Sequence, residues 1–467
     1  MRTTWAERAG EIAAELASHF ERGGDLGSAI EYYDKAAAAA ASQGANREAV
    51  GYLDRALALL ERSDDSQARR ERQLEVLMTR GPSVLAASGY GSVEALDNYE
   101  RALDLALQLD NPIGQISSLM PLSICQQTRG NLAAGEQLAL ELVRVAERLN
   151  LPAPFIAQLS NPLSQVRLYQ GAVDDALALS DAAVAVMEIL RPPLTPRDSR
   201  PALWAEPSVL LYCQHGAASF AAGRLTQAGA AVEHALCIAR ELRHPFTLAY
   251  ASCWAALYED TIGQWESAIR LARQAIDTAQ TYDFPFWDGV ARIFCGHAMA
   301  CSGDPGAGLP LLREGIERWR RTGGRLAATM YFNMLAEACL VAGDVAAAQA
   351  ALGEAAVHAE QTGEQVFVAE IYRLQAECHR RTGAAPAEVE TLHHRAMETA
   401  RRQSTRLWEL RSTLAWHRLR HSAESRAALA AACSAFEQEA ATGNVAAARA
   451  MLAAWPLSAE RTPLPKN

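Results

Sequence analysis

Lysine is almost absent from this chain of 467 residues, which contains only Lys35 and Lys466. Nearly all of the positive charge is therefore carried by arginine, whose guanidinium stays protonated and cannot serve as a base or a nucleophile. Chemistry that needs a buried catalytic lysine is effectively excluded. The sequence Gly-x4-Gly-Lys-Ser/Thr is also absent, so the chain has no phosphate-binding loop of the Walker type.

Positive charge is in deficit overall, because 44 Lys and Arg residues face 54 Asp and Glu residues, for a net charge of −10. A nucleic-acid-binding surface needs excess positive charge, so the composition argues against nucleic acid as a partner. No apolar run reaches the roughly 18 residues of a membrane-spanning helix, and the N-terminal segment has no signal-peptide core. The nine cysteines are scattered without a CxxC pair, which is typical of reduced thiols. We therefore expect a cytoplasmic protein with no membrane partner.

Groups of residues that could carry chemistry are equally scarce. A zinc site needs about four ligands, usually in CxxC or HxxxH pairs, and no combination of two such pairs occurs in the sequence. His234 and Cys237 share a helix face, but they are only two residues. Carboxylate pairs such as Asp174-Asp175 stand at expected helix starts, where the helix dipole favours them. We expect no metal, no cofactor and no catalytic residue, and hence not an enzyme.

What the sequence does contain is a repeat, which is marked by glycines in similar contexts. The spacing is 40 residues across the series Gly223, Gly263, Gly303, Gly343 and Gly383. Further copies stand at Gly24, Gly130 and Gly171, and one insertion at residues 191–207, which contain five prolines, explains the single break in phase. A glycine after a helix is the favoured left-handed terminator, so each glycine indicates the turn of a helical hairpin.

Small residues accompany the glycines at fixed offsets, seven before, five after and twelve after. Around Gly263 these are Ala256, Ala268 and Ala275, and after Gly383 the two later offsets fall on Glu388 and Arg395. Positions seven apart lie on one helix face, where small side chains let two helices approach closely. This pattern is typical of a tetratricopeptide hairpin, although the period is longer than the usual 34 residues.

The predicted fold is therefore all-α, an α-solenoid in the form of a tetratricopeptide-like superhelix of about nine to ten helical hairpins. One degenerate hairpin is expected near Gly91, and an unpaired helix over residues 47–62. The expected organisation is an N-terminal repeat and extra helix (1–62), repeats (63–190), a proline-rich insertion (191–207), regular 40-residue repeats (208–422), C-terminal capping helices (423–456) and a flexible tail (457–467).

Several strings of residues resemble one family of bacterial regulators. They are 244–251 (HPFTLAYA), 284–287 (FPFW), 321–323 (RTG), 369–377 (AEIYRLQAE), 400–403 (ARRQ) and 408–411 (WELR). These strings resemble the C-terminal tetratricopeptide-like repeat region of bacterial adenylate/guanylate cyclase–ATPase (STAND-type) regulatory proteins. The resemblance covers essentially the whole chain, and the cyclase and ATPase modules of that family have no counterpart in it.

The resemblance implies a non-enzymatic scaffold or sensor arm that mediates protein–protein interaction in bacterial signalling or transcriptional regulation. It also implies an ATPase or cyclase module as a candidate partner. The chain would then be a fragment of such a regulator, or a product that has lost the upstream domains. No catalytic residue is carried over, because the resembling strings are structural.

In a tetratricopeptide array the first helix of each hairpin lines the concave groove, at about −13, −10, −6 and −3 from the glycine. These offsets give the candidate partner-binding residues Leu210, Phe220, Tyr250, Cys253, Leu257, Val290, Ile293, His297, Asn333, Glu337, Glu370 and Arg373. The groove is predicted to be apolar in the middle and charged toward the C-terminal end, which suits a peptide segment with an apolar anchor and a charged flank. Alternatively, a tightly wound superhelix or the proline-rich insertion fills the middle and makes these positions core.

Two further hypotheses remain beside the peptide groove. An enclosed cavity around Trp254, Tyr258, Phe286 and Trp287 would favour a small-molecule effector that regulates a cyclase or ATPase, and an enzyme site in the groove is the third. Packing between long helices is the favoured explanation of these aromatic residues. A solvated helix face is likewise favoured over an acidic partner for the only basic stretch, Arg401, Arg402, Arg406, Arg411, Arg418 and Arg420.

Overall fold

The computed structural model describes residues 2–190, 206–440 and 442–454, and over these ranges the chain forms helices joined by turns, with no strand. The fold is an all-α solenoid, as the 40-residue repeat predicts. Most of the proline-rich insertion, residues 191–205, and the predicted tail at 457–467 lie outside the described residues.

The helices divide at the insertion. Those before it are α1 (Arg2–Gly23), α2 (Leu26–Ser42), α3 (Asn46–Glu61), α4 (Gln67–Ser88), α5 (Val93–Gln108), α6 (Pro112–Thr128), α7 (Leu132–Arg148), α8 (Ala153–Leu159), α9 (Asn161–Tyr169) and α10 (Val173–Leu190). Those after it are α11 (Pro207–Ala221), α12 (Leu225–Leu242), α13 (Pro245–Thr261), α14 (Trp265–Thr281), α15 (Pro285–Cys301), α16 (Pro305–Arg321), α17 (Ala328–Val341), α18 (Val345–Thr362), α19 (Val368–Arg381), α20 (Pro386–Arg402), α21 (Arg406–Arg420), α22 (Ala423–Ser434) and α23 (Gly443–Ala453).

The repeated glycines form the turns between paired helices. Gly223 between α11 and α12 and Gly263 between α13 and α14 have φ of 81° and 80°, in the left-handed region that side chains other than glycine rarely adopt. The small residues lie where the paired helices touch. A Cβ atom added to Gly308 in α16 would lie 2.4 Å from the carbonyl oxygen of Gly296 in α15, so the two backbones are in direct contact.

One polar contact recurs between paired helices. The hydroxyl of Ser123 donates to the carbonyl oxygen of Gly135 at 2.7 Å, and that of Ser164 donates to the carbonyl oxygen of Ala176 at 2.8 Å. Both bonds join the position seven before the turn glycine to the position five after it. The buried hydroxyls are therefore satisfied by the facing helix, and the two hairpins repeat each other in atomic detail.

The expected register fails in the last glycine-marked hairpin. Glu388 and Arg395, which the offsets place at the helix contact, are exposed, whereas Val389 and Ala396 are buried. The reason is a longer turn, because α20 begins three residues after Gly383, whereas α18 begins two residues after its glycine. The extra residue moves the buried face of α20 by one position.

One turn and one helix also differ from the sequence prediction. In the hairpin of α4 and α5 the residue with positive φ is Gly89, at 87°, and Gly91 instead makes a close contact with another part of the chain. The first helix of the next but one hairpin is divided into α8 and α9, with Pro162 in the first turn of α9. Proline is tolerated there because the first N–H groups of a helix have no partner within the helix.

The C-terminal region contains one more hairpin than the glycine count gives. Helices α21 and α22 pack together, and the residue that ends α21 in the left-handed conformation is His421, with φ of 43°. The predicted C-terminal helices at about 424–440 and 444–455 correspond to α22 and α23, and α22 ends at Ser434. Helix α3, which stands where an unpaired helix is predicted, packs between α2 and α4.

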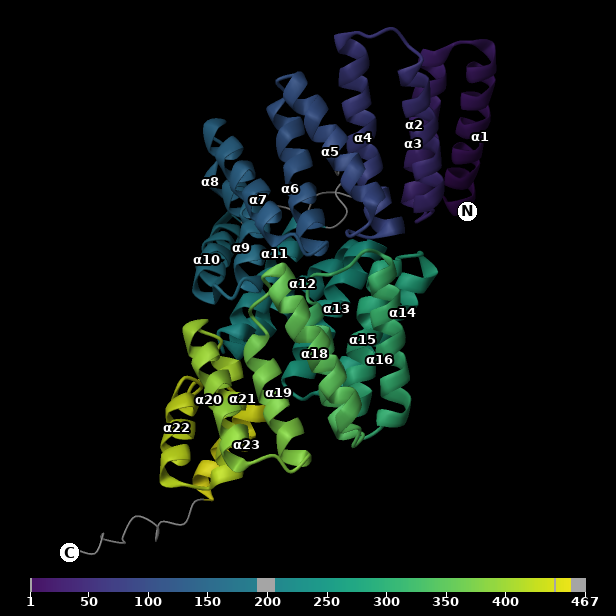
Figure 1. Cartoon of the computed structure of the whole chain (residues 1–467). Helices are drawn as coiled ribbons and strands as arrows, with labels where there is room; N and C mark the ends of the chain where they lie inside the picture. Colours follow the sequence, from purple (N-terminus) through teal and green to yellow (C-terminus); the bar gives the residue numbers. More distant parts are fainter. Residues whose placement is uncertain (1, 191–205, 441, 455–467) are drawn as a thin grey trace, which may run out of the picture.

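The superhelix closes on itself after about half of the chain. The carbonyl oxygen of Thr128 accepts hydrogen bonds from the backbone N–H groups of Arg325 and Leu326, at 2.7 and 3.0 Å. One repeat later, the carbonyl oxygen of Tyr169 accepts from the N–H of Gln365 at 2.7 Å. In Figure 1 the helices α14 to α16 accordingly lie directly below α2 to α4. Successive turns of the superhelix are thus hydrogen-bonded backbone to backbone.

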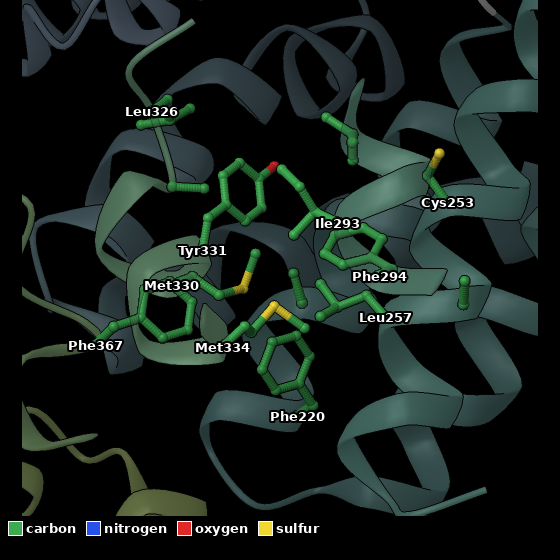
Figure 2. Close-up of a cluster of buried hydrophobic side chains, with 14 of the residues drawn as sticks. Phe220, Cys253, Leu257, Ile293, Phe294, Leu326, Met330, Tyr331, Met334 and Phe367 are labelled. Atoms are coloured by element: carbon green, nitrogen blue, oxygen red, sulfur yellow. The ribbon is translucent and has the colours of Figure 1, made fainter. Parts of the chain in front are cut away.

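The interior of the superhelix is largely filled by side chains. Figure 2 shows Leu257, Met330 and Phe220 converging from α13, α17 and α11, and these side chains belong to one continuous hydrophobic cluster. The first helices of the hairpins supply these residues, so the concave surface is mostly core. Cavities remain inside it, and two of them have both Leu257 and Met330 in their walls.

Candidate functional site

The larger cavity, which we call the charged cavity, has a volume of about 340 Å³. Six consecutive first helices surround it, α11, α13, α15, α17, α19 and α21, and the start of α23 completes the wall. Its polar and aromatic lining includes Phe220, Asp260, Trp265, His297, Cys301, Asn333, Glu337, Glu370, Trp408, Arg411 and Asn444. The rings of Phe220 and Trp408 meet edge to face at 6.2 Å, so the first and last of these helices touch.

The lining residues occupy a different level on each helix. Asp260 stands three residues before its turn glycine, His297 six before, and Glu370 thirteen before. The cavity therefore extends from the C-terminal end of α13 to the N-terminal end of α19. The positions of Asp260 and Glu370 relative to their turn glycines differ by ten residues, which correspond to about 15 Å of α-helix. Each first helix is therefore displaced along its axis relative to the preceding one. This displacement is the rise of the superhelix.

Glu337 is the centre of a buried charge network. Its carboxylate accepts two hydrogen bonds from Nη2 of Arg411, at 2.7 and 2.9 Å, and one from Arg373 at 3.3 Å. Glu370 is bound by the same two guanidiniums, at 3.2 Å from Arg411 and 2.9 Å from Arg373. Two carboxylates and two guanidiniums therefore neutralise one another. Burial raises the pKa of Glu337, but the charges of Arg411 and Arg373 outweigh burial and hold this pKa well below its ordinary value of 4.5.

A second pair of charges adjoins this network. Nδ1 of His297 lies 2.7 Å from Oδ2 of Asp260, and its Nε2 lies 3.5 Å from the sulfur of Cys301 and 3.7 Å from Glu337. Burial lowers the pKa of His297, but the Asp260 carboxylate and the Cys301 sulfur outweigh burial. The pKa of His297 therefore lies well above its ordinary value of 6.5, and the imidazole is held in its protonated form.

Several polar atoms in the wall of the charged cavity have no hydrogen-bond partner in the protein. They are Oδ1 of Asp260, Oδ1 of Asn333 and Nε1 of Trp408. The orientation of the Asn333 amide is fixed, because its Nδ2 donates to the carbonyl oxygen of Phe367 at 3.1 Å. Buried polar groups are normally paired, so unpaired ones in a cavity wall indicate where a ligand or water binds.

The smaller cavity, which we call the aromatic cavity, has a volume of about 80 Å³. It is bordered by Tyr90, Tyr250, Trp254, Phe286, Trp287 and Tyr331. Tyr250 and Trp287 meet edge to face with ring centres 5.0 Å apart. Tyr258 is elsewhere, where its hydroxyl donates to the carbonyl oxygen of Leu225 at 3.1 Å. Helix α13 lies between the two cavities.

The predicted groove residues divide between these two cavities. Those lining the charged cavity are Phe220, Leu257, His297, Asn333, Glu337 and Glu370. Those lining the aromatic cavity are Leu210, Tyr250, Cys253, Leu257 and Val290. Ile293 is fully buried beside them, and Arg373 takes part through Glu337 and Glu370. The concave surface is thus neither an open groove nor solid core.

The sequence prediction assigned Arg411 wrongly and left out Trp408. Arg411 was expected on a solvated face, but its side chain is only 16% exposed and contacts two carboxylates. The other members of the basic stretch are exposed. Trp408 and Arg411 stand 13 and 10 residues before His421, so the groove offsets identify both once His421 is taken as the turn of a tenth hairpin.

Within the described ranges, no group of three or more His, Cys, Asp or Glu side chains is arranged to hold a metal ion. Nor does any helix in this part of the chain combine the length and apolarity needed to cross a membrane.

Comparison with known proteins supports the fold. No family model matches the chain. An uncharacterized protein of Rhizobium meliloti (strain 1021) is 24% identical over 418 residues, which are 87% of this chain but 38% of that protein. The chain therefore spans well under half the length of this relative.

Two solved structures have a similar fold. One is a Rap protein complexed with Competence and Sporulation Factor, with a TM-score of 0.56, 11% identity, and coverage of 82% of this chain and 99% of that one. The other is NprR in complex with its cognate peptide NprX, with a TM-score of 0.52, 14% identity, and coverage of 77% and 98%. Repeat, helix pairing and these similarities together define a tetratricopeptide-like helical solenoid.

Proposed function

We propose that this chain is a non-enzymatic regulatory arm that binds a short peptide segment inside its superhelix, with the charged cavity as the main binding site. The observation that carries this proposal is the charged cavity itself, which six consecutive repeats surround and whose wall holds unpaired polar atoms. The fold similarity to a Rap protein, solved with Competence and Sporulation Factor, and to NprR, solved with its cognate peptide NprX, supports this class of ligand.

The arrangement also suits the transmission of a binding event. A ligand in the charged cavity contacts the first helices from α11 to α21. The connections that precede α17, α19 and α21 pack against turns of earlier hairpins, at Gly91, Gly130 and Gly171. Occupation of the cavity would therefore shift the balance between superhelices of different pitch, since a ligand favours the state that it binds more tightly. The proposed output is a change in the surface offered to a partner protein.

The test is to fill the cavity and to measure peptide binding. Cys301 and Asn444 both line the charged cavity, and we propose Cys301→Trp and Asn444→Trp as two independent filling variants. Cys237 is exposed on α12, so Cys237→Trp is the matched control. Binding of a library of short fluorescent peptides is measured by anisotropy, and folding by circular dichroism. We expect bound peptides to be lost from both filled variants and kept by the control.

Two results would contradict the proposal. One is unchanged peptide binding by filled variants that melt like the native protein. The other is the absence of any peptide ligand from a library that spans apolar and charged residues at every position.

A small-molecule effector is the second candidate, and it would occupy the aromatic cavity. This hypothesis is favoured by the position of Trp254, Phe286 and Trp287 in one cavity wall. The volume of about 80 Å³ admits only a small apolar group. Tyr250→Phe and Trp254→Phe would then weaken the binding of small aromatic compounds while leaving peptide binding unchanged. The reverse pattern would support the peptide.

We further propose that the arm belongs to a STAND-type regulator and acts on an ATPase or cyclase module in bacterial signalling or transcription. The sequence resemblance and the greater length of the Rhizobium meliloti relative support this assignment. The test is whether an ATPase or cyclase encoded on the same chain or beside it co-purifies with the arm, and whether a bound peptide changes its activity.

A further inference from the structure

We propose that the ligand of the charged cavity presents a protonated amine, which binds between Oδ1 of Asp260 and Oδ1 of Asn333. This inference rests on the proposed function, and it specifies the chemical group that the charged cavity recognises. The group is a primary ammonium, from the N-terminus of a peptide, from a lysine side chain or from a free amine.

Two residues that line the charged cavity each have a buried acceptor with no hydrogen-bond partner, Oδ1 of Asp260 and Oδ1 of Asn333. The Asp260 side chain is only 2% exposed, and Asn333 is 6% exposed as a whole residue. The Nδ2 atom of Asn333 is already used by Phe367, so its free oxygen can only accept a hydrogen bond. Leaving such groups unpaired is costly, and a ligand with several N–H donors would remove this cost.

The carboxylates of the cavity wall differ in the cations that they already have beside them. Glu337 and Glu370 are each bound by both Arg373 and Arg411, and this quartet is neutral. Asp260 has His297 alone, at one of its two oxygens. It is therefore the carboxylate in the cavity wall that is free to take a further cation.

An anion is disfavoured here, because a carboxylate or phosphate at the free oxygen of Asp260 would face like charge in a buried site. The cavity wall also contains the aromatic residues Phe220, Trp265 and Trp408, and the faces of such rings attract cations. One of these faces, that of Trp408, already has the Arg411 guanidinium 5.7 Å from its centre. Hydrocarbon next to the ammonium would also be buried there.

A bound ammonium and the proton of His297 then compete for Asp260. The charged or titratable groups that face His297 are Asp260 on α13, Cys301 on its own helix and Glu337 on α17. An ammonium placed beside Asp260 repels the imidazolium and favours its loss of a proton. Amine binding should therefore tighten as the pH rises through the titration of His297, up to the pH at which the amine itself becomes neutral.

The experiment compares three probes that differ only in the end group: 2-phenylethylamine, 2-phenylethanol and 3-phenylpropionate. Binding to the full chain is measured by titration calorimetry and by the fluorescence of Trp265 and Trp408. We expect the amine to bind at least tenfold more tightly than the alcohol, and the carboxylate not to bind. The comparison of probes needs no variant, so it is independent of any folding defect.

Asp260→Asn provides the residue-level test, and Asp288→Asn is the matched control. Asp288 is also a buried aspartate, but it pairs with Arg292 and Arg318 outside the charged cavity. We expect Asp260→Asn to weaken amine binding about ten- to a hundred-fold, since a charged hydrogen bond is lost, and to abolish its pH dependence. The control should retain both. Equal binding of amine and alcohol, tighter binding of the carboxylate, or unchanged amine affinity in folded Asp260→Asn would each overturn the inference.

Experiments with modified peptides identify the source of the amine. They also distinguish a failure of this inference from a failure of the proposed function. Peptides that bind are compared with N-acetylated forms and with forms in which lysine is replaced by norleucine. Loss on acetylation identifies the N-terminus, and loss with norleucine identifies the side chain. One outcome is that peptides bind, that the filled variants lose this binding, and that neither N-acetylation nor norleucine weakens it. In that case this inference fails and the proposed function stands. If the filled variants still bind peptides, the proposed function fails first.

Discussion

At the scale of single residues, the charged cavity brings together ionisable groups that water normally keeps apart. Asp260, His297 and Glu337 come from three consecutive first helices and meet within 3.7 Å. Neighbouring charges raise the pKa of His297 and lower that of Glu337, and the network is stable only while partners stay paired. Two predictions follow from this balance.

The first prediction concerns the pH dependence of stability. The pKa of His297 is raised in the folded protein, so its stabilising contribution is complete below the unfolded value of about 6.5 and is lost as the pH rises through the folded value. Urea unfolding from about pH 6 to about pH 9 should show a decline in the free energy of unfolding that His297→Gln lacks.

His393 provides the control, because burial and the charge of Arg373 lower its pKa to about 4. Its contribution is present above about pH 6.5 and is lost only in acid, so His393→Gln should leave the decline above neutral pH unchanged. If the free energy of unfolding of His297→Gln declines with pH as it does in the native protein, the raised pKa of His297 is contradicted.

The second prediction concerns the carboxylate at the centre of the network. Glu337→Gln removes the charge that Arg373 and Arg411 share and leaves two guanidiniums with one carboxylate. We expect a loss of about 3–5 kcal/mol in the free energy of unfolding, measured by urea denaturation, because a buried charge is left unpaired. Glu354→Gln breaks an exposed pair with Arg320 and should cost less than about 1 kcal/mol. Equal effects would show that the network contributes no more than a surface pair.

At the scale of elements, the unit of this protein is a pair of helices held in backbone contact. Such a contact occurs between α15 and α16, where Gly296 and Gly308 face each other. Because no side chain separates them, the hairpin is fixed in both distance and register. This rigidity holds His297 and Cys301 in place on α15.

The third prediction tests this contact. Gly308→Ala would place a methyl group 2.4 Å from the carbonyl oxygen of Gly296, so the helices must separate. We expect a cost of about 1–3 kcal/mol, measured as a lower midpoint in thermal and urea unfolding. The control is Gly353→Ala in α18, where nothing lies within 4 Å of the added carbon. That change should stabilise by about 0.5–1 kcal/mol, because alanine is the better helix former. A neutral Gly308→Ala would mean that the two helices are free to move apart.

At the scale of the whole molecule, the two turns of the superhelix form one body. An array in which each repeat contacts only its neighbours can unfold in parts. Here Gly91 packs against the backbone of Gly323, and Thr128 and Tyr169 accept hydrogen bonds from segments about 200 residues away. We therefore expect distant repeats to open together.

The fourth prediction measures that coupling by amide hydrogen exchange. A Cβ atom on Gly91 would lie 2.3 Å from the carbonyl carbon and oxygen of Gly323. Gly91→Ala should therefore speed exchange in two segments at once, around residues 85–95 and around residues 319–326. Gly51→Ala, where the added carbon meets nothing, is the control and should change neither segment. Faster exchange confined to the first segment would show that the turns are independent.

The sequence predicts local features of the fold better than features that depend on residues far apart. Hairpin turns such as Gly263 and contact positions such as Ala256 follow from local rules, because glycine permits positive φ and small residues permit close approach. The shift to Val389 in α20 follows from one extra residue in a turn, which the offsets alone did not reveal. Arg411 was missed because a histidine ends its helix in place of glycine.

The sequence by itself determined the pairing of helices in the glycine-marked hairpins, their order and which face of each first helix points inward, because these depend on residues close together in the chain. Only the tertiary structure decided that position −3 of α13 contacts position −6 of α15 and lines the same cavity as position −13 of α19. That choice depends on the rise of the superhelix, to which every hairpin adds a small displacement. The displacement comes from packing between successive repeats and from contacts about 200 residues apart, so no local pattern encodes where the charged cavity forms.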